Sequence, residues 1–168
     1  MTDTLKKLEQ IIRHDTALIT GNFIVKEGNT YFAFERYQII PKKHRVTVKR
    51  YGNDMGEFTS TRTAMGWCVA DKYNQLNLAD DIIRLDQQRS RLRDDLEVQE
   101  RMLPKFRGAD YREILRLKID TKKQLLKDTE ERLNKCVVVA KYWQIRGFND
   151  EIERTRRSAS NRTSIPRD

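Results

Sequence analysis

Leu78–Leu103 reads LADDIIRLDQQRSRLRDDLEVQERML, and its seam positions recur at alternating spacings of four and three residues. Leu115–Trp143 repeats this spacing after a break at Pro104–Asp110. A mean spacing of about 3.5 residues keeps one stripe of a helix against a partner helix. The two stretches therefore predict a long antiparallel hairpin of two helices with a coiled-coil seam.

The predicted seam consists of apolar residues that the two helices turn toward each other. They are Leu78, Ile82, Leu85, Leu92 and Leu96 on the first helix, and Leu115, Ile119, Leu126, Leu133 and Cys136 on the second. Arg89 and Lys122 interrupt the seam near its middle. Such basic residues either lay their stems along the seam or mark a surface for a further helix or an anionic partner. A second copy of the chain, forming a homo-oligomer, is one way to complete a seam with polar gaps.

The residues before the hairpin predict a small antiparallel β-sheet packed on helices, so the expected class is α+β. Apolar residues share one face of a short predicted helix over residues 4–18. Aromatic and branched residues, separated by turn residues, then predict three or four strands. These strands lie within residues 23–25, 31–40, 45–51 and 57–59.

A helix is predicted directly after the strands. Ser60 or Thr61 can cap its N-terminus, and Trp67 and Cys68 then face the sheet. A joint over residues 73–75 separates this helix from the hairpin.

Gly147 is predicted to end the second long helix, because glycine is favoured just past a helix C-terminus. The polar, arginine-rich residues that follow are typical of an extended segment. The predicted domains are therefore 1–75, a small α+β domain; 76–148, the helical hairpin; and 149–168, a basic tail.

The composition favours an elongated, charged protein with an anionic partner. The chain has 168 residues, of which 38% are hydrophobic and 35% charged, and its formal net charge is +9. The excess of basic residues is dispersed, but two sets are candidates for binding nucleic acid or another anionic partner. They are Lys42, Lys43, Arg45, Lys49 and Arg50 on the sheet, and Arg154, Arg156 and Arg157 in the tail.

The sequence offers no recognisable catalytic arrangement. The two histidines, His14 and His44, have no neighbouring nucleophile or carboxylate in a known motif, and phosphate-loop patterns are absent. Cys68 and Cys136 do not form a C-x-x-C pair. We therefore expect a protein that is not an enzyme and that has no cofactor and no metal site. The chain shows neither a signal peptide nor an apolar run that could span a membrane.

Two strings resemble a known family. WCVADKY at Trp67–Tyr73 and CVVVAKYWQIRGF at Cys136–Phe148, together with the run from Phe58 to Trp67, resemble an uncharacterised family of small proteins from tailed bacteriophages of marine cyanobacteria and relatives. The resemblance covers roughly residues 45–150. It implies a virion component or a phage-encoded accessory factor, located in the host cytoplasm or the virion, and it assigns no functional residues.

These observations predict an interaction protein, either a structural component of a phage particle or an assembly component. Its helical arm and basic tail would contact neighbouring viral subunits. Two alternatives are a nucleic-acid-binding accessory protein that uses the basic and aromatic sheet surface, and a phage-encoded binder of a host protein. No membrane partner is expected.

Overall fold

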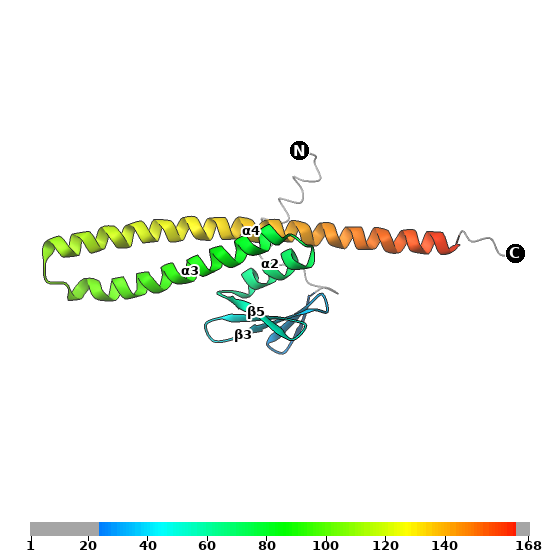
Figure 1. Ribbon diagram of the computed structural model, residues 1–168, viewed down its shortest axis with the longest axis horizontal. Coiled ribbons are helices and arrows are strands. Elements are labelled where there is room, and N and C mark those ends of the chain that lie inside the picture. The colour runs from blue at the N-terminus through cyan, green and yellow to red at the C-terminus, as the bar shows by residue number, and fades with distance from the viewer. Residues whose placement is uncertain (1–23, 164–168) are drawn as a thin grey trace, which may run out of the picture.

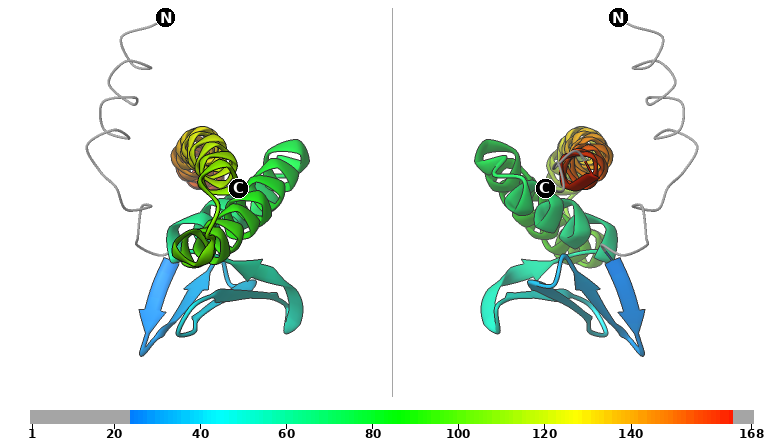
Figure 2. Two further views of the ribbon diagram at one scale, coloured as in Figure 1. Left: turned by 90° about the vertical axis from the view of Figure 1, so that its left-hand side faces the viewer. Right: turned by 90° about the vertical axis from the view of Figure 1, so that its right-hand side faces the viewer.

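The computed structural model describes residues 24–163, so the predicted helix over residues 4–18 lies outside the described part (Figure 1). Helices account for 69% of the described residues and pack against a five-stranded antiparallel sheet. The end-on views of Figure 2 show the strands gathered on one side of the helices. The α+β class predicted from the sequence is confirmed.

The sheet is a meander in which each strand pairs with the next one along the chain. Its strands are β1 (Ile24–Glu27), β2 (Thr30–Ala33), β3 (Tyr37–Pro41), β4 (Val46–Arg50) and β5 (Asn53–Phe58). The predicted number of three or four strands is too low, because the single strand expected over residues 31–40 is two strands. Phe34 and Glu35 adopt φ values of 53° and 58°, and the Arg36 N–H donates to the Ala33 carbonyl at 3.1 Å. This tight turn contains neither glycine nor proline.

The helices follow the sheet in one run. They are α2 (Thr61–Lys72), α3 (Leu76–Met102), the 3-10 helix η1 (Leu103–Lys105) and α4 (Ala109–Thr163). Ser60 caps α2 as predicted, since its hydroxyl accepts a hydrogen bond from the Thr63 N–H at 3.2 Å. The predicted joint between α2 and α3 contains Asn74 at a φ of 56°.

Helix α2 lies between the sheet and the two long helices. The Trp67 ring faces the sheet as predicted, with its centroid 6.1 Å from that of Tyr37 and 6.0 Å from that of Phe58. Behind it, Gly66 lets α2 approach α4, because a Cβ at this position would lie 3.3 Å from the Val137 side chain. The sheet, α2 and the bases of α3 and α4 therefore share one core.

Helix α4 is continuous through Gly147 as far as Thr163, so the predicted helix end at this glycine is wrong. A Cβ at Gly147 would lie 2.2 Å from two ring carbons of Tyr73. The glycine is therefore needed where α4 approaches the end of α2, and not for a left-handed turn. The prediction of an extended tail from residue 149 is likewise wrong as far as Thr163. This end of α4 projects past the body, on the side opposite the α3–α4 turn (Figure 1).

Helices α3 and α4 run antiparallel over the length of α3 (Figure 1). Most predicted seam residues are covered in the contact between them. Ile82, Leu85, Leu92, Leu96, Ile119 and Leu133 are buried, and Leu78, Leu115, Leu126 and Cys136 are half-buried. The α3–α4 arm is thus rooted in the core of the body and becomes more open toward its tip.

Candidate functional site

The distal half of the arm exposes apolar side chains that the seam does not use. Of the nine large apolar residues with high exposure in the described chain, six lie between residues 98 and 125. These six define the distal strip: Val98 (54% exposed), Met102 (42%), Tyr111 (68%), Ile114 (51%), Leu117 (61%) and Leu125 (44%). Scattered single apolar residues are normal on a surface, but such a concentration makes this region a candidate contact surface.

Helical spacing places the α4 members of the distal strip on one face. Ile114, Leu117, Thr121 and Leu125 follow one another at steps of three, four and four residues. Thr121 lies in the middle of this run, and its Oγ1 donates to the Leu117 carbonyl oxygen at 2.9 Å. The hydroxyl is therefore satisfied within its own helix and does not place an unpaired donor in the distal strip.

On α3, Met102 lies about one helical turn beyond Gln99, whereas Val98 is turned about 100° from Gln99 around the helix. Gln99, between Val98 and Met102, lines an open groove of about 560 Å³ together with Ile114 and Leu117 of α4. Lys122 and Asp95 pair at 3.4 Å on this side. The groove and the neighbouring α4 members of the distal strip, Ile114 and Leu117, form a mainly apolar part of this flank.

The opposite flank is polar. Arg93 pairs with Glu130 at 2.9 Å, and Lys123 pairs with Glu100 at 3.2 Å. These ion pairs are exposed, so each contributes little stability, and they present a solvated surface. The two flanks of the arm therefore differ in polarity, with charged residues on one and apolar residues on the other.

The structure pairs much of the predicted basic sheet surface with acids. The pairs are Arg45 with Glu57 at 3.3 Å, Lys49 with Asp54 at 4.0 Å, and Arg50 with Asp71 at 3.0 Å. Lys42 and Lys43 lie exposed beside the β3–β4 turn, and Lys42 shares a hollow of about 310 Å³ with Lys49, Asp54 and Glu57. The positive charge predicted for this surface is thus largely offset by neighbouring carboxylates.

Arg50 connects the sheet to α2 through an ion pair with Asp71. Its Nη1 donates to both carboxylate oxygens of Asp71 at 3.0 Å, and the Tyr37 hydroxyl donates to the same carboxylate. Tyr37 is 1% exposed, and its burial, reinforced by Asp71, raises its pKa far above the usual range. Because Asp71 occupies the Arg50 guanidinium, the predicted role of Arg50 in binding an outside anion is weakened.

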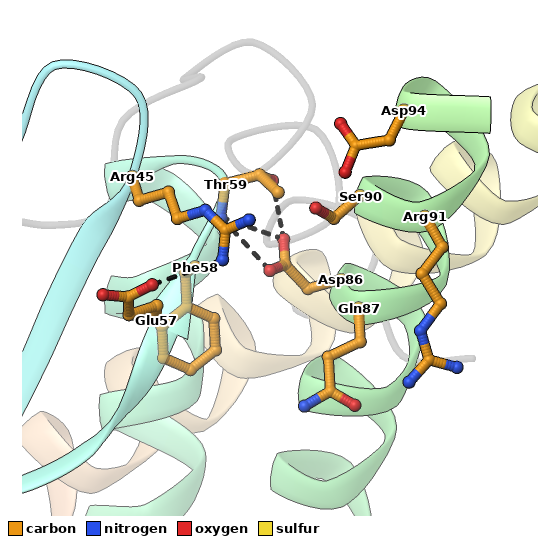
Figure 3. Close-up of a pocket in the computed structure, with 9 residues that line it drawn as sticks. All are labelled: Arg45, Glu57, Phe58, Thr59, Asp86, Gln87, Ser90, Arg91 and Asp94. Carbon is orange, nitrogen blue, oxygen red and sulfur yellow. Dashed lines mark hydrogen bonds and ion pairs between the residues drawn. The ribbon is translucent and has the colours of Figure 1, made fainter. Parts of the chain in front are cut away.

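A polar hollow of about 480 Å³ lies between the end of β5 and α3 (Figure 3). At its base, Asp86 accepts hydrogen bonds from the Thr59 N–H at 3.1 Å and the Thr59 hydroxyl at 2.7 Å. Arg89 pairs with Asp86 at 3.2 Å, and burial lowers the pKa of this arginine. The Asp86 carboxylate is therefore fully engaged in joining α3 to the sheet. Arg89, which the seam spacing placed toward α4, belongs to this junction instead.

The far end of α4 carries the predicted tail arginines. Arg154, Arg156 and Arg157 are exposed on the part of the helix that projects past the body. From residue 154 to residue 167 the sequence contains five arginines and no acidic residue. The arginines of this basic end therefore belong to a different element from Lys42 and Lys43, which follow β3.

Within residues 24–163, no helix is long and apolar enough to cross a membrane, and no three His, Cys, Asp or Glu side chains gather as metal ligands. No family model, curated protein or solved structure matches this chain.

Proposed function

We propose that this chain is a non-enzymatic interaction protein whose arm docks a protein partner through the distal strip. The observation that carries the proposal is the clustering of six exposed apolar residues on the distal half of the arm, four of them on α4. With six large apolar residues roughly half exposed, the distal strip presents at most on the order of 600 Å² of surface. That is the upper end of what soluble monomers expose, and patches of this size are often functional.

The architecture of the arm supports the same role. The 3–4 spacing and the buried leucines favour a coiled-coil packing of α3 on α4, which gives a stiff arm. Leu133 and Ile82 anchor its base in the core of the body. A partner bound at the distal strip is thereby held at a fixed distance from the sheet.

The resemblance to phage proteins supports a place in a virion or in its assembly, where subunits contact one another through extended surfaces. In this setting the partner of the arm is a neighbouring viral subunit. A host protein bound at the same strip is the alternative within this class.

Site-specific photo-cross-linking tests the proposal. A photoreactive amino acid is placed at Leu117, in the distal strip, or at Asn134, an exposed polar position further along α4. Each variant is produced during infection, and adducts are identified by mass spectrometry in lysates and in purified virions. We expect a defined adduct from position 117 and none from position 134. Equal yields from the two positions would refute docking at the strip.

A second candidate function is binding of nucleic acid by the basic end of α4. Three exposed arginines on a projecting helix favour it over the sheet surface, whose basic groups are mostly paired. Retention on duplex DNA should then fall with salt at a slope of about −0.9 per phosphate neutralised. Changing Arg154, Arg156 and Arg157 to Gln should reduce retention more than changing Lys42 and Lys43 to Gln. Equal effects of the two changes would contradict this assignment.

A further inference from the structure

We propose that the occupant of the distal strip is a second copy of this chain. Two arms would pack through the same strip about a two-fold axis parallel to the helices, and would form a bundle of four helices. The inference rests on the proposed docking function of the strip and names its partner.

The width of the apolar face of α4 supports a bundle. In the distal half, residues of the strip stand directly beside residues of the seam: Ile114 beside Leu115, and Leu125 beside Leu126. Leu115 and Leu126 are half-buried against α3, whereas Ile114 and Leu125 are exposed. A narrow apolar stripe suits a two-stranded coil, but a wider face is typical of a helix that has neighbours on two sides. A second arm would supply the missing neighbour.

The exposed area is sufficient for a stable contact between two copies. The strip contributes at most on the order of 600 Å² per copy, so an isologous contact that covered all of it would bury roughly 1,200 Å². Polar residues at the edge of the groove, including Lys118 and Gln99, add to this area. The sum then reaches the lower end of the range of about 1,200–2,000 Å² that specific interfaces bury.

The flanks of the arm leave room for this contact. Asp86 bonds to Thr59 at the end of β5, and Arg93 lies seven residues later on the same face of α3, on the polar flank. The sheet therefore lies toward the polar flank of the arm, and the apolar flank faces away from it. Two copies joined through their apolar flanks keep their bodies apart on opposite sides of the bundle.

The charges beside the strip are compatible with self-association. A two-fold axis parallel to the helices lays α3 of one copy antiparallel over α4 of the other. The acidic Asp95, beside Val98, then approaches the level of the basic Lys122 of the other copy. Because these two residues already pair within one arm at 3.4 Å, the contact would form a shared network of alternating charge.

Sedimentation equilibrium of the full chain over about 1–200 µM tests the proposal. We expect a dimer whose dissociation constant rises at least tenfold on Leu117→Glu. The control is Asn134→Glu, which introduces the same charge on the same helix away from the strip and should leave the dissociation constant unchanged. Ile114→Glu provides a second strip variant, and circular dichroism checks that each variant is folded.

Two results would overturn self-association. One is a chain that stays monomeric over the whole concentration range, and the other is a dimer equally tolerant of Leu117→Glu and Asn134→Glu. If photo-cross-linking from position 117 then captures a different protein in a defined adduct, the docking function stands and the second copy is the wrong partner. If position 117 captures nothing, both proposals fail.

Discussion

The effect of the buried ion pair between Asp86 and Arg89 on stability can be tested directly, because the same helix contains an exposed ion pair with the same spacing. Asp86 and Arg89 are three residues apart, with 3.2 Å between Oδ1 and Nη2. Asp81 and Arg84 have the same spacing and the same distance. The side chains of the first pair are 3% and 13% exposed, and those of the second are 52% and 57% exposed. The two pairs thus differ mainly in burial and in the Thr59 hydrogen bonds.

Replacing Asp86 with Asn removes the charge that compensates Arg89 inside the junction of α3 and β5. Removal of one partner from a buried pair costs about 3–5 kcal/mol. In Asp86→Asn, Arg89 keeps Thr59 as a hydrogen-bond acceptor and retains slight exposure. We therefore expect a loss of unfolding free energy near the lower end of this range, about 3 kcal/mol. Asp81→Asn should cost about 0.5 kcal/mol or less, because exposed pairs are weak.

Urea unfolding followed by circular dichroism measures both changes, at one fixed protein concentration so that self-association does not differ between samples. A third variant, Asp86→Asn combined with Arg89→Met, removes the uncompensated charge. It should recover part of the loss, because an apolar replacement of a buried pair is often neutral. Equal costs for Asp86→Asn and Asp81→Asn would refute the assignment of Asp86 as a buried link between α3 and the sheet.

Three further changes test the packing and the buried titratable groups. Gly147→Ala should destabilise the fold by about 2 kcal/mol despite the better helix propensity of alanine, whereas Gly66→Ala should cost less in the same urea assay, because its nearest neighbour is 3.3 Å away. Tyr37→Phe should cost about 1.5 kcal/mol through the lost hydrogen bond to the carboxylate on α2, and a larger loss than that of Gly147→Ala would contradict this ranking. Burial raises the pKa of the thiols of Cys68 and Cys136 in the folded chain. The two thiols therefore make their full contribution to the free energy of unfolding below about pH 8.5. This contribution declines as the pH rises further, because the thiols of the unfolded chain lose their protons first. Changing both cysteines to Ala should flatten the dependence of stability on pH between about pH 8 and 10.

The parts of the fold that follow from local patterns were predictable from the sequence. Ser60 before an apolar run predicts the start of α2, and the 3–4 spacing predicts two long antiparallel helices. Each signal depends on residues within a few turns of one another, so no knowledge of tertiary contacts is needed. The position of Trp67 against the sheet follows from the same helical spacing.

The errors arose where a distant contact or a turn without its usual residues decides the structure. Gly147 has the local signature of a helix end, but Tyr73, 74 positions earlier, requires a residue without a side chain there. The turn at Phe34 and Glu35 forms without glycine or proline, so the sequence pattern predicts β2 and β3 as a single strand. In both cases the local conformation is decided by packing between elements and not by the intrinsic conformational preference of the residues.

The candidate site was predicted only in part. Arg89 and Lys122 interrupt the predicted seam near its middle, and the exposed Ile114 and Leu117 lie between Lys122 and the tip of the arm. The strip itself was missed because the seam interpretation assigned the apolar residues of α4 to one stripe, although a second 3–4 series beginning at Ile114 is visible in the sequence. The pairing of the sheet arginines could not be predicted, because Glu57 and Asp71 come from other elements.

The continuity of α4 links the two proposed binding surfaces mechanically. Leu117 and Arg156 lie on the same helix about 60 Å apart at 1.5 Å per residue. In the proposed dimer, a two-fold axis parallel to the helices makes the two copies of α4 parallel. Both basic ends therefore project from the same end of the bundle. A polyanion can then contact two basic ends at once, and the second contact benefits from a high effective concentration. Leu117→Glu should therefore weaken retention on DNA although it lies far from the arginines, and an unchanged retention in a chain made monomeric would exclude this coupling.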